Sequence, residues 1–174
     1  MKDKSLREEE TDNSVKSRTI GEKTESQKWV AFGVNNELFA IEALEALEVQ
    51  KYSEITPVPG AKPYVRGLIN LRGKVITVID IRTLFRLDRK PIDDKTIIIL
   101  VEFNKDEIVG FIVDDVNEIV DIETKNIGVT PKISGNDAKN EFLKGVTYVN
   151  KKMIIILDIK KINTYLTPVI EEEF

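Results

Sequence analysis

Two stretches of this chain repeat the same pattern of turn, strand and basic end. The first, Gly67–Arg82, reads GLINLRGKVITVIDIR, and the second, Gly145–Lys160, reads GVTYVNKKMIIILDIK. Without a gap, the leading Gly, the Lys at the turn, the apolar strand, the Asp-Ile pair and the final basic residue coincide. Coincidences spread over sixteen positions exceed what two unrelated hairpins share, so we interpret the stretches as an internal duplication.

A weaker sequence similarity extends the duplication to the rest of each half. Ala40-Ile41 corresponds to Gly110-Phe111, and Glu48-Val49 corresponds to Glu118-Ile119. Each half of about 70 residues is therefore expected to contain a hairpin, a short bend, a second hairpin and a short helix. Halves so rich in short strands predict a mainly β fold of two small barrels packed side by side.

The residue types along the chain predict where the individual strands and helices lie. Strands are expected over residues 29–34, 38–41, 65–70, 75–79, 96–103, 108–113, 116–120, 142–149 and 153–157. Glu42–Val49 has helical propensity but is too short for a stable helix, so a helical turn followed by a strand near Val49 is expected. Asp80 is a candidate N-cap of a short helix. A closing helix is expected over Ile159–Leu166, with Pro168 beyond it.

The chain is expected to divide into four segments. Residues 1–26 mix charges of both signs with few apolar side chains, which predicts a disordered tail. The first β-barrel subdomain is expected over residues 27–90 and the second over 91–167, followed by an acidic tail over 168–174. The sequence contains no apolar run long enough for a membrane span or a signal peptide, so we expect a cytoplasmic protein.

Missing residue types restrict the chemistry. The chain contains no cysteine and no histidine, which removes the thiolate nucleophile, the Cys-type zinc site and the usual general base near neutral pH. Neither GxGxxG nor GxxxxGK[ST] occurs. A net charge of −4 offers no counterion release on nucleic acid. We therefore expect a protein that is not an enzyme and that carries no cofactor and no metal.

Two polar features remain as candidate sites. Asp114-Asp115 could hold a hard cation or serve acid–base chemistry, but adjacent strand residues point to opposite faces, so an ordinary turn is the favoured interpretation. Arg72 lies in a turn between apolar strands, and Glu48 ends the preceding bend. A guanidinium there could pair bidentately with a carboxylate and stay oriented for a partner. An ordinary solvated arginine is the alternative.

These motifs closely resemble the signature of the CheW coupling proteins of bacterial chemotaxis. Asn70-Leu71-Arg72-Gly73 in its apolar setting carries the resemblance, together with the Val75–Arg82 stretch that follows. Phe32-Gly33-Val34 and Val109–Val116 fit the two halves of the family pattern, and the match covers residues 27–166. The resemblance implies two SH3-like five-stranded β-barrels around a shared hydrophobic seam.

The resemblance also implies a function and its surfaces. It implies a cytoplasmic scaffold that links the tips of methyl-accepting chemotaxis receptors to the regulatory domain of the histidine kinase CheA, and that reaches the membrane only through the receptors. The groove between the barrels would receive the receptor helix, near Glu48, Arg72, Ala46, Ile98 and Val116. The outer ends would contact the kinase, with Ile55 and Arg66 as candidates on one barrel and Ile133 on the other.

This sequence departs from the family pattern at two positions. Thr77 stands where the family often has Pro, which would allow more complete strand pairing. Ala46 is smaller than the usual branched residue, which is expected to weaken or retune the receptor contact.

Two other functions are weighed. The chain could be a regulatory or scaffold fragment of a larger two-component signalling protein, although no receiver-like βα pattern follows the second barrel. A small β-barrel that binds nucleic acid is less favoured because of the net charge of −4.

Overall fold

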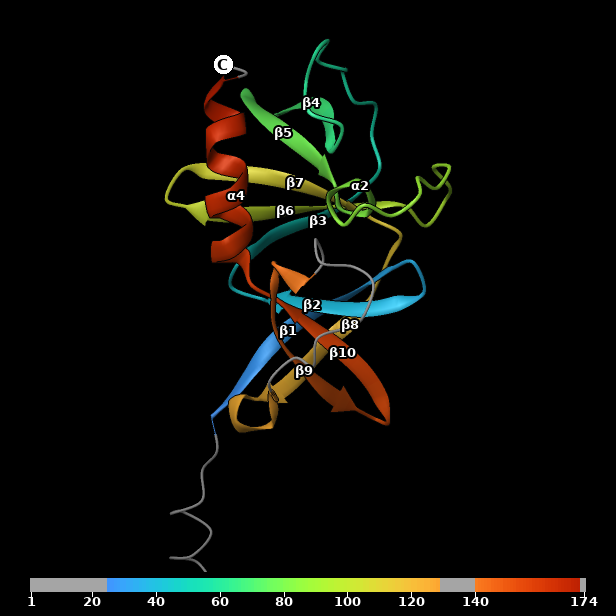
Figure 1. Ribbon diagram of the computed structural model, residues 1–174, viewed down its shortest axis with the longest axis vertical. Coiled ribbons are helices and arrows are strands. Elements are labelled where there is room, and N and C mark those ends of the chain that lie inside the picture. The colour runs from blue at the N-terminus through green and yellow to red at the C-terminus, as the bar shows by residue number, and fades with distance from the viewer. Residues whose placement is uncertain (1–24, 129–139, 173–174) are drawn as a thin grey trace, which may run out of the picture.

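The computed structural model describes residues 25–128 and 140–172, so the predicted tail over residues 1–26 lies almost wholly outside the described residues (Figure 1). The strands, in chain order, are β1 (Ser26–Val34), β2 (Glu37–Glu42), β3 (Ala46–Lys51), β4 (Val65–Leu71), β5 (Lys74–Asp80), β6 (Ile97–Asn104), β7 (Glu107–Val113), β8 (Asp115–Glu123), β9 (Leu143–Val149) and β10 (Lys152–Leu157). Helix α2 (Ile81–Leu84) follows β5, the 3₁₀ turn η1 (Thr124–Asn126) follows β8, and helix α4 (Ile159–Glu172) follows β10.

The strands form two five-stranded sheets whose orders are β8-β1-β2-β10-β9 and β3-β6-β7-β5-β4. The sequence repeat matches β9–β10 with β4–β5, β2 with β7 and β8 with β3, and under this matching the two orders are the same. The parallel contacts agree as well, because Ile155 lies beside Phe39 and the corresponding Thr77 lies beside Val109. The predicted mainly β fold with two five-stranded units is confirmed.

The two halves of the chain exchange their hairpins. Hairpin β1–β2 pairs with β8 and β10 of the second half, and hairpin β6–β7 pairs with β3 and β5 of the first half. The predicted division into one barrel over residues 27–90 and another over 91–167 is therefore wrong. Both copies offer equivalent hydrogen-bonding edges, so the repeat alone does not show which copy a hairpin pairs with.

Among residues 25–128 and 140–172, each sheet closes on itself through one isolated bridge. Thr56, after β3, forms an isolated bridge with Leu68 on β4, and Gly128, after β8, forms the corresponding bridge with Val146 on β9. The backbone hydrogen bonds of these bridges measure 2.8–2.9 Å and 2.8–3.2 Å. The units are thus sheets joined end to end by a single bridge, which is consistent with SH3-like packing but is not a continuously paired barrel.

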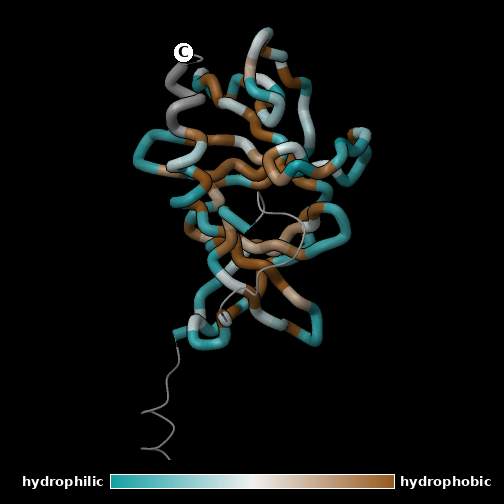
Figure 2. The backbone as a smooth tube through the Cα atoms, in the orientation of Figure 1, coloured by the Kyte–Doolittle hydropathy of each residue, from teal (hydrophilic) through white to brown (hydrophobic). Residues whose placement is uncertain are grey.

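The main hydrophobic core lies between the two sheets. It combines residues of both sheets with residues of α2 and α4, including a row of rings from Phe32 through Phe39 and Phe85 to Phe142, whose successive centroids are 6.0, 5.5 and 6.2 Å apart. Figure 2 shows hydrophobic segments where the sheets meet and hydrophilic turns at the periphery. Because strand residues alternate between faces, each sheet also buries a smaller cluster on its other face.

The helices are partly as expected. The Asp80 side chain accepts a hydrogen bond from the Arg82 N–H at 3.0 Å, so its predicted role as N-cap of α2 is confirmed. No helix forms within Glu42–Val49, but the Glu45 and Ala46 N–H groups donate to the carbonyl oxygens of Glu42 and Ala43, so the segment makes a single turn of i→i+3 type. The strand expected near Val49 follows as β3. Helix α4 continues past Leu166 to Glu172, so most of the predicted acidic tail is helical.

Thr77 is paired on both sides of β5, with Leu68 on β4 and Val109 on β7, as the absence of proline predicts. Its side chain is buried, and its hydroxyl has no hydrogen-bond partner. Full strand pairing at this position therefore comes with an unsatisfied buried hydroxyl, which is unfavourable.

The leading glycines of the repeat make the closing bridges possible. A Cβ atom at Gly67, which has φ +144°, would overlap the carbonyl oxygen of Thr56, and a Cβ atom at Gly145 would overlap that of Gly128. Both overlaps involve the backbone of a bridge, which cannot move away as a flexible side chain would.

Gly67→Ala and Gly145→Ala are each expected to lower the free energy of unfolding by about 2 kcal/mol or more, because the added methyl group forces the closing bridge apart. Urea unfolding followed by far-UV circular dichroism measures the loss. Gly128→Ala is the matched control, since its Cβ would meet nothing closer than 3.7 Å. Equal losses in all three variants would contradict the role given to Gly67 and Gly145.

A polypeptide of residues 25–90 is expected to remain unfolded on its own, because its hairpin β1–β2 and its strands β3–β5 belong to different sheets. Amide chemical-shift dispersion in NMR spectra tests this expectation. Mixing it with a polypeptide of residues 91–172 is expected to restore the dispersed spectrum. A dispersed spectrum from either fragment alone would contradict the exchanged arrangement.

Candidate functional site

The turn that carries Arg72 has the geometry of a two-residue hairpin loop. Arg72 and Gly73 have φ values of +50° and +86°, as type I′ turns require, and the Gly73 N–H donates to Asn70 Oδ1 at 3.0 Å. The corresponding residues Asn150 and Lys151 have φ values of +50° and +65°. The left-handed backbone is therefore a property of the duplicated hairpin and not of a binding site.

An ion pair joins Arg72 to Glu48 as the sequence predicts. Arg72 Nη2 lies 3.1 Å from Glu48 Oε2, through one nitrogen and one oxygen, so the contact is not the bidentate one considered above. The Arg72 side chain is 77% exposed and that of Glu48 35%. Because β3 and β4 are the two outer strands of their sheet, the pair spans the opening between the sheet's ends.

The other predicted receptor residues differ in their burial. Ala46 on β3 and Val116 on β8 are half-buried, and both pack against the core between the sheets. Ile98 is 0% exposed and lies in the smaller cluster of its own sheet. A direct contact between Ile98 and a partner is therefore excluded in this structure, because other side chains cover it completely.

Exposed apolar side chains on the outer strands were missed in the sequence. Leu47 and Val49 on β3 are 47% and 43% exposed, and Ile119 on β8, which matches Val49 in the repeat, is 64% exposed. Apolar side chains left exposed on sheet edges are typical of sites where another chain binds. Leu47 and Val49 alternate with polar residues in the sequence, but this alternation does not show which face of β3 is exposed.

Two of the three predicted kinase residues, Ile55 and Arg66, lie near one closing bridge. Ile55 precedes Thr56 of that bridge and is half-buried against the cluster inside its sheet. Arg66 lies on β4, with Nη1 3.7 Å from Oδ2 of Asp80. Ile133 lies outside the described residues.

Asp114 is not the ordinary turn residue that the sequence suggested. Arg82 Nε donates to Asp114 Oδ1 at 2.8 Å, Arg82 Nη2 donates to Oδ2 at 2.7 Å, and the Asn35 N–H also donates to Oδ2 at 2.8 Å. Burial would raise the pKa of Asp114, but these hydrogen bonds outweigh it and lower the pKa. The hydrogen bond to Asp114 raises the pKa of Arg82. The pair thus connects helix α2 of one unit to the β1–β2 turn of the other.

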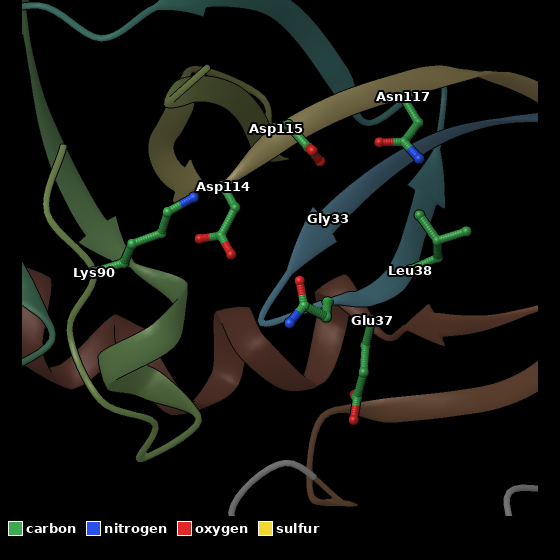
Figure 3. A pocket seen from close by; sticks show the side chains of 8 residues that line it. Gly33, Glu37, Leu38, Lys90, Asp114, Asp115 and Asn117 are labelled. Carbon is green, nitrogen blue, oxygen red and sulfur yellow. The ribbon is translucent and has the colours of Figure 1, made fainter. Parts of the chain in front are cut away.

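A polar hollow of about 240 Å³ opens beside this pair (Figure 3). Lys90 extends toward Asp114, while Asp115 and Asn117 face one another from the start of β8. The hollow is lined by none of the residues predicted to bind the receptor or the kinase, so it belongs to neither predicted site.

The described residues contain no group of three or more acidic side chains arranged to hold a metal ion. None of the helices in this part of the chain is long and apolar enough to cross a membrane.

The protein consists of two five-stranded units with exchanged hairpins. Apolar side chains are exposed on their outer strands, and an exposed ion pair lies at one rim. These features are typical of a mainly β module that binds other proteins. Comparison with protein families agrees, because the CheW-like domain matches residues 28–165, which is most of the chain. The chain belongs to the CheW family.

Individual relatives support this membership. The chain is 34% identical to the chemotaxis protein CheW of Bacillus subtilis over 130 residues, covering 75% of this chain and 83% of that protein. It is 29% identical to the chemotaxis protein CheW of Klebsiella aerogenes over 146 residues, covering 84% and 86%. The crystal structure of the scaffolding protein TtCheW from Thermoanaerobacter tengcongensis superposes with a TM-score of 0.70 at 33% identity, covering 77% and 90%. The expected chemotaxis scaffold family is confirmed.

The two arginine ion pairs are expected to differ in their effect on stability. Arg72→Ala should change the free energy of unfolding by no more than about 0.5 kcal/mol, because an exposed pair is well solvated. Arg82→Ala should cost about 3 kcal/mol, because it leaves the carboxylate of Asp114, which is 15% exposed, without its partner. Urea unfolding at pH 7 measures both, and similar losses would contradict the distinction between the two pairs.

Proposed function

We propose that this chain is a non-enzymatic adaptor that couples chemoreceptors to the histidine kinase CheA in the cytoplasm, within membrane receptor arrays. Membership of the CheW family over residues 28–165 supports the proposal. The observation that carries it is the rim of β3, where the Arg72–Glu48 ion pair is accessible to solvent and Leu47 and Val49, the residues on either side of Glu48 in the chain, are exposed.

The receptor contact is proposed at this rim. An exposed ion pair is worth little by itself, so Arg72 can turn from Glu48 to a carboxylate of a partner at small cost. Leu47 and Val49 would supply apolar surface that becomes buried against a helix, at about 25 cal/mol per Å². Ala46 and Val116 extend the contact toward the core between the sheets, so a helix seated there would touch both units. Ile98 would support this surface only by packing beneath it.

The kinase contact is proposed at the outer ends of the two units. On one unit it would include Ile55 and Arg66, beside the Thr56–Leu68 bridge. On the other unit Ile133 stays a sequence-based candidate. Contacts at two opposite ends would allow one adaptor to join two kinase regulatory domains.

Isothermal titration of the full chain against the regulatory domain of the cognate kinase, and separately against a receptor tip fragment, tests the proposed function. Binding to both, in the range up to tens of micromolar, is the expected result. No binding to either fragment would overturn the proposal.

Arg72→Glu is expected to weaken the affinity for the receptor fragment at least tenfold, about 1.4 kcal/mol, because it places a second carboxylate beside Glu48. The affinity for the kinase domain and the urea midpoint should stay unchanged. Lys151→Glu is the matched control, since it makes the same charge change in the corresponding turn of the other unit. If Arg72→Glu unfolds the protein, Arg72 has a structural role instead.

A further inference from the structure

The chain passes from one sheet to the other at two crossovers. Residues 43–45 connect β2 to β3, and Asp114 connects β7 to β8. Each crossover carries an acidic side chain at the boundary between the units, Glu45 in the first and Asp114 in the second. The two carboxyl groups have very different surroundings.

Asp114 is held by a complete set of partners. The guanidinium of Arg82 contacts both of its oxygens, and the Asn35 N–H adds a third hydrogen bond. These contacts lower the pKa of Asp114, so this crossover keeps its charge throughout the neutral range.

The backbone of the Glu45 crossover is bonded to both sheets. The Glu45 N–H donates to the Glu42 carbonyl oxygen at 3.0 Å, and the Glu45 carbonyl oxygen accepts the Glu102 N–H of β6 at 3.0 Å. One step earlier, the Ala43 N–H donates to the Lys28 carbonyl oxygen of β1 at 2.9 Å. A displacement of Glu45 therefore affects the position of one unit relative to the other.

The Glu45 side chain faces a hollow of about 350 Å³ with mixed charges. Glu42 of β2 and Asp158 before α4 supply negative charge, while Lys144 of β9 and Lys160 of α4 supply positive charge. The nearest resolved ion pair, Lys144 Nζ to Glu42 Oε1, is 3.9 Å long. Within the described part of the chain, no ion pair or hydrogen bond reaches the Glu45 carboxylate.

This environment moves the Glu45 titration into the neutral range. Burial has the largest effect and the charge of Glu42 the next, and together with Asp158 they raise the pKa of Glu45 from 4.5 to about 7, against the opposing effect of Lys144 and Lys160. Asp114 thus stays ionised in the neutral range, whereas Glu45 changes its charge near pH 7.

We propose that the Glu45 crossover is a proton-dependent junction between the two units: the neutral carboxyl packs into the hollow, and the ionised one is repelled by Glu42 and Asp158. Ionisation then loosens the crossover and the start of β3, the strand that continues to Glu48. This inference concerns the protein alone and does not rest on the proposed partners.

The direction of the effect follows from proton linkage. The folded state binds the Glu45 proton more tightly than the unfolded state, whose Glu45 has the ordinary pKa of 4.5. The contribution of Glu45 to stability is therefore greatest at low pH, declines as the pH rises from 4.5 to about 7, and stays low above it.

An NMR titration of the full chain between pH 4 and 9 tests the junction. The Glu45 carboxyl resonance should titrate near pH 7, and the hydrogen-exchange protection of the Glu102 amide, corrected for the intrinsic rate, should fall about tenfold between pH 6 and 8. Glu45→Gln should abolish this fall, while Glu118→Gln, the same change at an exposed strand position, should preserve it.

Two variants that change a charge beside Glu45 keep the proposal testable even if the Glu45→Gln variant does not fold. Glu42→Gln should move the Glu45 midpoint down, because it removes a negative neighbour, and Lys144→Gln should move it up. A midpoint near 4.5, shifts of both variants in the same direction, or an unchanged protection pattern in Glu45→Gln would overturn the proposal.

Discussion

The reciprocal exchange of hairpins is the constraint on which the rest of this structure depends. Hairpin β1–β2 completes the sheet of the second half, and hairpin β6–β7 completes the sheet of the first half. Neither half can therefore satisfy its backbone hydrogen bonds alone. The exchange also places aromatic residues of both halves in one core between the sheets, where α2 and α4 cover them. Two small sheets that would each be marginal by themselves become one cooperative unit.

The exchange requires the chain to cross between the sheets twice. The acidic side chains at the two crossovers have opposite environments, because one favours the ionised carboxylate and the other disfavours it. At Asp114, a bidentate arginine compensates the cost of burying a carboxylate. At Glu45, burial of the carboxylate and the charges of Glu42 and Asp158 outweigh the opposing charges of Lys144 and Lys160, so its ionised form is disfavoured. The two crossovers also differ in length, because residues 43–45 connect β2 to β3 whereas Asp114 alone connects β7 to β8.

The rim of β3, where the receptor contact is proposed, owes its position to the same architecture. Because Glu48 and the turn of Arg72 lie at opposite ends of one sheet, their ion pair marks the place where the sheet nearly closes. An exposed ion pair contributes little to the free energy of folding, so its two side chains stay available to a partner. Leu47 and Val49 are directed outward there, because the inward face of β3 is turned to the core.

Local signals in the sequence determined a large part of this protein: the duplicated hairpins with their turns, the Asp80 cap, the paired Thr77 and the contact between Arg72 and Glu48. These features depend on strand periodicity, turn chemistry and charges near the chain's own hairpins, which neighbouring residues specify. Only the tertiary structure decided which half each hairpin joins, which side chains cover Ile98, and that Arg82 neutralises Asp114. The physical reason is that both copies present equivalent strand edges, so the choice between them rests on packing among residues far apart in the chain.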